Sequence, residues 1–226
     1  MPAAHALAVE RTAHYWTHGP LDGTADTVWM GLHGYAQRAA ELLDDLMPLA
    51  AEDTLLIAPE ALSRFYRRGT DGAIGASWMT SAERDDEIAD YLAYLDRLRD
   101  TLTPRLAPDA TWHVLGFSQG AATASRWAAH TETSLGRLVL WGGTLAHDLD
   151  LAAWAAQPPA DRVELVLGAT DRYLTAERVA QEERRLTVAE VAYAVHRYDG
   201  GHAIRPQVLQ RVADHSSGAS ASERRS

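Results

Sequence analysis

The chain contains no cysteine among its 226 residues. It therefore has no disulfide, no cysteine nucleophile and no thiolate-bound metal. Lysine is also absent, so all 21 basic residues are arginine and no lysine can form a Schiff base. The sequence lacks asparagine as well, which removes every acceptor for N-glycosylation. We attribute the missing lysine and asparagine to a genome rich in G and C.

Long apolar runs and an excess of positive charge are missing too. No run approaches the roughly 18 apolar residues of a membrane span. Residues 1–10 hold no basic region followed by an apolar stretch, so we expect no secretory signal and a cytoplasmic protein. The formal net charge of −10 is opposite to that of most proteins that bind nucleic acid through phosphates. The histidines show no zinc-binding spacing, so no metal is expected.

Short apolar runs alternate with helical stretches along the chain, and 46% of the residues are hydrophobic. This pattern predicts an α/β fold with a mostly parallel, doubly wound sheet and helices on both faces. The expected strands cover residues 27–32, 54–58, 111–116, 137–141, 163–168 and 191–198, with an antiparallel edge strand within 8–17. Helices are expected around 42–49, 88–102, 119–130, 175–186 and 206–213.

One domain should span residues 1–214, followed by a disordered tail over 215–226 that is rich in Ser and charge. Residues 63–79 are rich in Gly and Arg without a clear period, and we interpret them as a long surface loop. Its Arg64, Arg67 and Arg68 either form a solvated face, which we favour, or meet an acidic leaving group. Residues 142–162 hold one short helix near 149–155, too little for a cap domain.

Gly116-Phe117-Ser118-Gln119-Gly120 is the most informative stretch. It lies directly after an apolar run and before an alanine-rich helical run, which is the layout of a nucleophile elbow. The glycines are explained by close backbone packing on either side of such a turn. Ser118 is therefore the candidate nucleophile.

Partners for this serine follow later strands in the order serine, acid, histidine, which is the order of α/β-hydrolase triads. Asp171 follows the strand at 163–168, and His202 follows the strand at 191–198. His202 would be the general base and Asp171 the residue that orients it. Asp148, Asp150 and Asp199 are alternative acids.

An oxyanion would be bound by the backbone N–H groups of Tyr35 and Gln119. His33 is expected to shape the turn that carries Tyr35 rather than to transfer protons. A substrate pocket could be lined by further residues that lie near strand ends or in the long loop: His33, Trp78, Met79, Gly143, Thr144 and Leu145.

The chain resembles the phospholipase/carboxylesterase family of small α/β-hydrolases, which includes acyl-protein thioesterases. The matching stretches are Leu32-His33-Gly34-Tyr35, Ser77-Trp78, Gly116–Gly120, Gly168-Ala169-Thr170-Asp171 and Gly200-Gly201-His202. The resemblance implies a capless fold, hydrolysis of acyl esters or thioesters, no cofactor, and frequently a homodimer.

We therefore expect a serine hydrolase that cleaves carboxylic acid esters with short to medium acyl chains through an acyl-enzyme. The partner would be a small-molecule ester, with no nucleic acid and no integral membrane association. A thioesterase or deacylase acting on acyl-proteins or lysophospholipids is the alternative within the same fold. A non-catalytic hydrolase-fold binding protein is the alternative from another class. A histidine base predicts that the rate falls as the pH drops through roughly 6–7.

Overall fold

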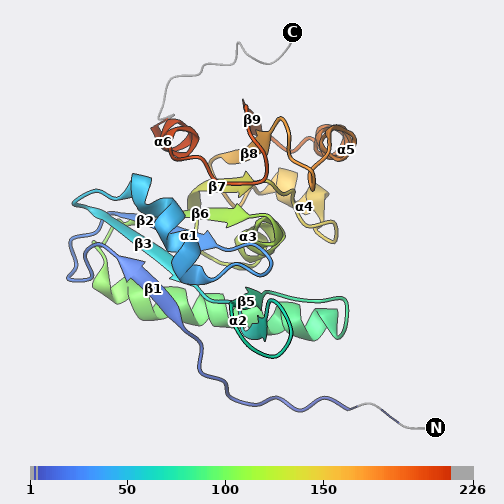
Figure 1. Cartoon of the computed structure of the whole chain (residues 1–226). Helices are drawn as coiled ribbons and strands as arrows, with labels where there is room; N and C mark the ends of the chain where they lie inside the picture. The colour runs from blue at the N-terminus through green and yellow to red at the C-terminus, as the bar shows by residue number, and fades with distance from the viewer. Residues whose placement is uncertain (1–2, 4, 215–226) are drawn as a thin grey trace.

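The structure is a computed structural model that describes residues 3 and 5–214. Its centre is a seven-stranded sheet in the order β1-β3-β2-β6-β7-β8-β9, in which only β1 runs antiparallel to its neighbour. The strands are β1 (Tyr15–His18), β2 (Thr27–Leu32), β3 (Thr54–Pro59), β6 (Thr111–Phe117), β7 (Leu135–Trp141), β8 (Val163–Gly168) and β9 (Ala194–Tyr198). The predicted mostly parallel sheet is confirmed, and Figure 1 shows its layered arrangement.

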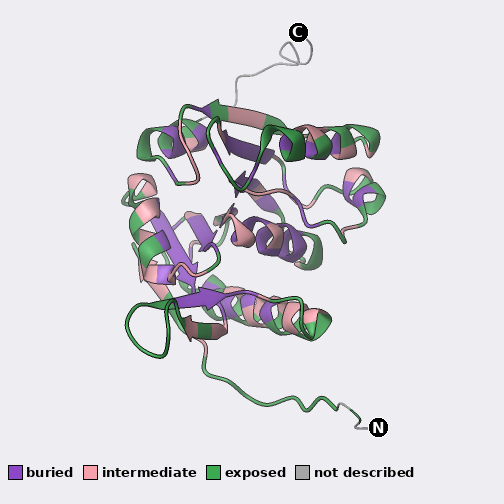
Figure 2. Ribbon diagram, turned by 45° about the vertical axis from the view of Figure 1, so that its right-hand side comes forward, coloured by how far each residue is buried: buried purple, intermediate pink, exposed green. Residues whose placement is uncertain are grey.

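Helices cover both faces of the sheet. They are α1 (Ala39–Leu46), α2 (Arg84–Leu102), α3 (Gln119–His130), α4 (Leu151–Ala156), α5 (Ala176–Val188) and α6 (Pro206–Asp214). Side chains of α1 and α6 share one apolar cluster, whereas those of α2 to α5 share the other. Neighbouring strand residues alternate between the clusters, as Val139 and Leu140 of β7 do, because successive side chains point to opposite faces. Figure 2 shows the buried strands between helices whose outer sides are exposed.

The segment at 63–79 differs from the expected loop. It forms a β-hairpin in which β4 (Ser63–Tyr66) pairs antiparallel with β5 (Ile74–Ser77). Phe65 pairs with Gly75, so at this position only one of the two strands has a side chain beyond Cα. The expected alternation of apolar and polar residues is therefore weak, which explains why the pattern did not predict these strands.

The ends of two other strands also differ from the prediction. The edge strand begins at Tyr15 rather than near residue 8, because pairing with β3 starts where Tyr15 meets Pro59. The last strand begins at Ala194, because pairing with β8 starts there. The predicted tail at 215–226 lies outside the described residues. No described helix is both long and apolar enough to cross a membrane.

Candidate active site

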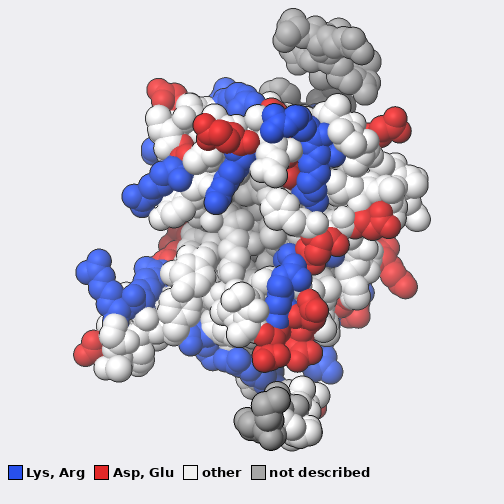
Figure 3. All heavy atoms as spheres, turned by 90° about the vertical axis from the view of Figure 1, so that its right-hand side faces the viewer, with Lys and Arg blue, Asp and Glu red and all other residues white. Residues whose placement is uncertain are grey.

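Three predicted catalytic side chains lie at the carboxyl edge of the sheet. Ser118 follows β6, Asp171 lies three residues after β8, and His202 lies in the turn between β9 and α6. The parallel strands point to the right in Figure 1, and Figure 3 looks onto that side. There, a hollow of uncharged residues is bordered by arginine and acidic side chains. Ligands of open α/β sheets bind at this edge.

Ser118 has a strained backbone, with φ 54° and ψ −114°, and occupies the N-cap position of α3 without a capping hydrogen bond from its side chain. Such a conformation is costly for a residue with a Cβ and persists only where the surroundings impose it. A Cβ on Gly120 would overlap the carbonyl oxygen of Leu32, and one on Gly116 would lie 2.6 Å from the Cα of Ala121. The two glycines are therefore required for the sharp turn, as expected for a nucleophile elbow.

A continuous chain of short contacts joins the three side chains. The Nε2 of His202 lies 2.8 Å from the Oγ of Ser118. The other ring nitrogen, Nδ1, lies 2.6 Å from the Oδ2 of Asp171. The second carboxylate oxygen of Asp171 accepts the backbone N–H groups of Tyr173 at 2.8 Å and Leu174 at 3.1 Å. One oxygen of this acid thus binds the backbone and the other binds His202. The His202 ring is held between the Asp171 carboxylate and the Ser118 hydroxyl.

The Asp171 side chain is 1% exposed. Burial alone would raise the pKa of Asp171, but the hydrogen bonds from His202, Leu174 and Tyr173 outweigh it and lower this pKa below its ordinary value. The carboxylate is thus ionised at neutral pH and can stabilise positive charge on the imidazole.

The alternative acids lie in other contacts. Asp148 accepts Nε and Nη2 of Arg126 at 2.8–3.1 Å, and Asp150 caps α4 by accepting the N–H groups of Ala152 and Ala153. Asp199 is exposed. Among the described residues, Asp171 is the only one of these four acids that forms a hydrogen bond with His202.

Two aromatic rings flank the His202 imidazole. The Phe117 ring centroid lies 4.9 Å from it and the Tyr173 centroid 4.7 Å. Gly142 lies on another side, where a Cβ would come within 3.1 Å of the ring. The imidazole therefore has little room to rotate away from Ser118.

The predicted oxyanion donors lie on two segments beside Ser118. Gln119 is the first residue of α3, and a Cβ on Gly34, next to Tyr35, would lie 3.3 Å from the Cβ of Ser118. Neither the Tyr35 nor the Gln119 amide donates to an acceptor within residues 5–214. Both N–H groups are therefore available to an anionic oxygen formed at Ser118.

His33, which we also considered as a pocket residue, is completely buried. Its Nδ1 lies 2.8 Å from the carbonyl oxygen of Gly34, and its Nε2 accepts the N–H of Ala61 at 3.1 Å. Burial lowers the pKa of His33, which keeps the ring neutral with its proton on Nδ1. His33 thus fixes the Gly34 carbonyl and presents no side-chain surface to a substrate.

The Gln119 side chain binds the segment that follows β5, a role that the sequence pattern did not reveal. Its Oε1 accepts the Trp78 N–H at 3.1 Å, and its Nε2 donates to the Met79 carbonyl oxygen at 2.8 Å. The Trp78 ring is 3% exposed and its Nε1 donates to the His33 carbonyl oxygen at 2.9 Å. Trp78 therefore packs inside the protein instead of facing a pocket.

The remaining predicted pocket residues lie on both sides of α3. Gly143 lies against the elbow, since a Cβ there would be 2.7 Å from the Ser118 carbonyl oxygen. Leu145 is completely buried, and its N–H donates to the Oε1 of Glu182 at 3.1 Å. Met79 and Thr144 are partly exposed, so with Gly143 they stay predicted pocket residues.

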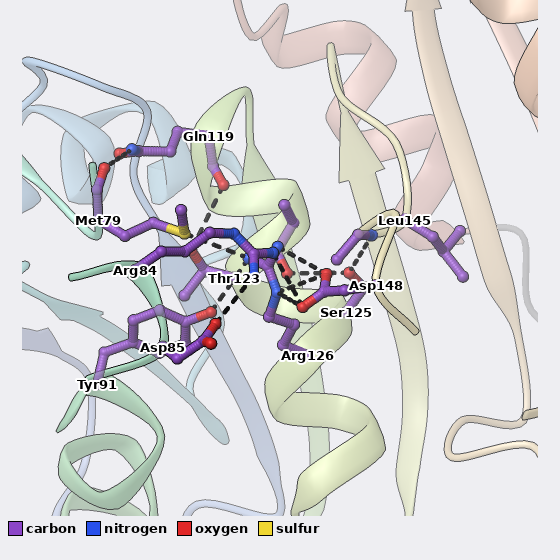
Figure 4. A network of polar contacts seen from close by, with 12 residues as sticks. Met79, Arg84, Asp85, Tyr91, Gln119, Thr123, Ser125, Arg126, Leu145 and Asp148 are labelled. Carbon is purple, nitrogen blue, oxygen red and sulfur yellow. Dashed lines mark hydrogen bonds and ion pairs between the residues drawn. The ribbon is translucent and has the colours of Figure 1, made fainter. Parts of the chain in front are cut away.

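Figure 4 shows a polar network between Met79 and Leu145, centred on the buried Arg126, that sequence reasoning missed. At its centre, the guanidinium of Arg126 contacts Asp148, the Tyr91 hydroxyl at 3.2 Å and the Met79 sulfur at 3.7 Å. Arg84 also pairs with Asp148 at 3.0 Å, and these hydrogen bonds hold the pKa of Asp148 well below its usual range. The network joins α2 and α3 to the segment after β7. A helix-internal arginine gives no local signal of such a role.

Two further features bear on what the site can bind. No three His, Asp or Glu side chains within residues 5–214 are grouped so that they could hold a metal ion. A cavity of about 500 Å³ lies between the end of α3 and α4. Its lining includes Asp150, one of the alternative acids, but neither Ser118 nor Asp171 nor His202. The triad, not this cavity, is the candidate reaction centre.

No family model matches the sequence, and no match to it was found among the curated proteins. Solved structures are similar in fold. They include a carboxylesterase from Mesorhizobium loti (TM-score 0.67, 17% identity, covering 88% of this chain and 92% of that one). Acyl-protein thioesterase 2 from Zea mays matches with a TM-score of 0.66 and 20% identity over 89% of this chain and 96% of its own. The Bacillus cereus carboxylesterase matches with a TM-score of 0.65 and 16% identity over 88% and 91%.

At these identities the likeness concerns the fold, and it agrees with the sheet order and the elbow described above. The chain has the α/β-hydrolase fold, which it shares with solved carboxylesterases and an acyl-protein thioesterase.

Proposed function

We propose that this chain is a serine hydrolase that cleaves carboxylic acid esters through Ser118, His202 and Asp171. The observation that carries the proposal is the hydrogen-bond chain from Asp171 through His202 to Ser118, at 2.6 and 2.8 Å, with the serine in a strained elbow. A serine hydroxyl is a weak nucleophile at neutral pH, and this arrangement supplies the base that it needs.

The first half of the reaction forms an acyl-enzyme. The Nε2 of His202 takes the proton of the Ser118 hydroxyl as the oxygen attacks the ester carbonyl carbon. The C–O bond to the alcohol then breaks, and His202 returns the proton to the leaving oxygen. In the second half, water gives one proton to His202 as its oxygen attacks the acyl carbon. The bond from that carbon to the Ser118 Oγ then breaks, His202 returns the proton to this oxygen, and the acid is released. Asp171 holds Nδ1–H and stabilises the imidazolium in both halves.

The negative charge that develops on the carbonyl oxygen would be bound by the N–H groups of Tyr35 and Gln119. Both amides lie beside Ser118. The Gln119 amide is at the N-terminus of α3, so the positive end of the helix dipole also stabilises negative charge there. Losing one such donor typically costs about 10²–10³ in kcat.

We infer a preference for short to medium acyl chains. The segment between β7 and β8 carries only α4 (Leu151–Ala156), with no separate cap domain within residues 142–162, and the hollow in Figure 3 is open to solvent. Such a site offers little enclosed apolar surface to a long chain. Faster turnover of emulsified long-chain esters than of p-nitrophenyl butyrate would contradict this preference.

The test of the reaction is Ser118→Ala. We expect loss of ester hydrolysis and of labelling by a fluorophosphonate probe, with the fold retained because alanine fits the space of serine. Labelling that persists in the variant would place the nucleophile elsewhere. Ester binding by the wild type without turnover would favour the non-catalytic binding protein.

Thioester hydrolysis is the second candidate, since one of the structural neighbours is an acyl-protein thioesterase. The same acyl-enzyme would form, but the leaving group would be a thiol. Matched oxygen and sulfur esters of one acyl group, measured side by side, separate the two activities.

A further inference from the structure

The turn that carries the Tyr35 amide contains a second strained residue. Ala36 has φ 64°, in the left-handed region that favours glycine. The N–H of Gln37 donates to the Gly34 carbonyl oxygen at 3.2 Å, so Tyr35 and Ala36 are the central residues of one tight turn. The Tyr35 amide thus belongs to the same turn as the strained Ala36.

The β4–β5 hairpin holds Ala36 from two sides. The Ala36 N–H donates to the Ala76 carbonyl oxygen at 2.9 Å. The Nε of Arg67 donates to the Ala36 carbonyl oxygen at 2.7 Å. The backbones are in direct contact here, since a Cβ on Gly75 would lie 2.7 Å from the Cα of Ala36.

Arg67 is itself fixed by Glu41 near the start of α1. Its Nη2 contacts the Glu41 carboxylate oxygens at 2.9 and 2.6 Å. The Oε2 of Glu41 also accepts the N–H of Arg38, which precedes α1. The two side chains are 34% and 49% exposed, and so exposed a pair contributes little to global stability. The main effect of the contact is therefore local, because it holds Arg67 where its Nε donates to the Ala36 carbonyl oxygen.

We propose that Arg67 is a positioning residue for catalysis, which keeps the strained Ala36 turn, and with it the oxyanion-binding amide of Tyr35, in the active geometry. The inference rests on the proposed serine hydrolase mechanism, in which this amide binds the developing charge. A displacement of about 1 Å in a catalytic group can cost about 10²-fold in rate. Because the contact acts on the transition state, it affects kcat more than KM.

The experiment compares Arg67→Ala with Arg68→Ala, using p-nitrophenyl butyrate as an uncharged substrate. Arg68 is the next residue, is exposed, and forms no ion pair in the part of the chain that the structure describes. Both variants remove one positive charge from the same hairpin. For Arg67→Ala we expect kcat to fall about tenfold or more, as for partial loss of an oxyanion donor, with KM within about twofold. Arg68→Ala should match the wild type, and neither variant should shift Tm by more than about 2 °C. An equal kcat in both variants would refute the positioning role.

The same Arg67→Ala substitution, made in an Ala36→Gly variant, tests the role of the backbone strain at Ala36. Glycine adopts a positive φ without cost, so in Ala36→Gly the turn no longer needs Arg67 to hold it. We expect Arg67→Ala to lower kcat by a smaller factor in this background than in the wild type. The same factor in both backgrounds would mean that Arg67 does not act through the Ala36 turn.

Hydrogen exchange of the Ala36 amide provides a readout that does not depend on hydrolysis. If Arg67 holds the turn, Arg67→Ala should speed the exchange of this amide several-fold, and Arg68→Ala should not. Unchanged exchange would overturn the inference even if the wild type hydrolyses esters. Faster exchange in a protein that hydrolyses no ester would instead support the effect of Arg67 on the turn and refute the proposed function.

Discussion

Replacing Asp171 by asparagine tests the electrostatic part of the site without changing its shape. The Oδ1 of Asp171 accepts two backbone N–H groups, from Tyr173 and Leu174, and its Oδ2 faces the Nδ1 of His202. An asparagine has only one acceptor oxygen. Since the two backbone donors require that oxygen, the side-chain NH₂ group must face His202.

The NH₂ group would then donate to Nδ1 and leave the imidazole proton on Nε2. In that tautomer His202 cannot take the proton of Ser118, and no carboxylate stabilises the imidazolium. We expect kcat to fall about 10⁴-fold, which corresponds to about 5–6 kcal/mol of transition-state stabilisation. KM should change little, because Asp171 is buried behind His202.

The assay is the initial rate of p-nitrophenyl butyrate hydrolysis, with Asp150→Asn and Asp199→Asn as controls. Asparagine caps a helix about as well as aspartate, so α4 should keep its start in the first control. The pKa of Asp171 is lowered below its ordinary value in the folded protein, so its carboxylate stays ionised from pH 8 to pH 5 and the deficit should persist over that range. A residual rate within tenfold of the wild type, or an equal loss in either control, would refute the assignment of Asp171.

Three further substitutions probe the elbow, the contact with the segment after β5, and the sheet. Gly120→Ala should lower Tm by about 5 °C or more and abolish hydrolysis, because the added methyl overlaps the Leu32 carbonyl oxygen; an unchanged melting curve would contradict the packing. Gln119→Glu should lower the free energy of unfolding by about 1–3 kcal/mol, because a carboxylate oxygen would face the Met79 carbonyl oxygen now bound at 2.8 Å. Denaturant unfolding measures this loss, and an unaffected midpoint would speak against the contact. Burial, together with the charge of Arg137, lowers the pKa of His113 in the folded protein to about 4. As the pH drops from about 6.5 to 4, His113 is therefore protonated in the unfolded state before it is protonated in the folded state, and the free energy of unfolding decreases. His113→Phe should therefore reduce the stability lost between pH 7 and pH 4.5 by about 2–3 kcal/mol, and an equal loss in both proteins would show that another group titrates.

Much of the fold and the triad could be predicted because the signals are local or periodic. Buried parallel strands appear as short apolar runs, and each predicted run overlaps an observed strand. Ser118 could be recognised because a strand, two glycines and a helix lie within a few residues of it. Asp171 and His202 followed from topology, since the carboxyl ends of parallel strands meet at one edge.

The hairpin at 63–77 was not predicted, since its strands are short and one of them is poor in bulky residues. Whether His33 and Trp78 also line the pocket could not be settled from the sequence either. A histidine and a tryptophan near a site can line a pocket or be buried, and their packing partners Ala61 and Tyr91 lie far along the chain. Burial is a property of the whole tertiary structure, so no window of residues reveals it.

The sequence by itself determined a doubly wound sheet and the order of a serine, an acid and a histidine at its carboxyl edge. Only the tertiary structure decided how these groups are held. Arg67 contacts Ala36, 31 residues away, and Arg126 contacts Asp148, 22 residues away. Neither pair carries a pattern, because such contacts depend on which surfaces meet when the sheet, its helices and the hairpin pack together. The reacting atoms are thus set by local sequence, and the geometry that makes them reactive is set by distant contacts.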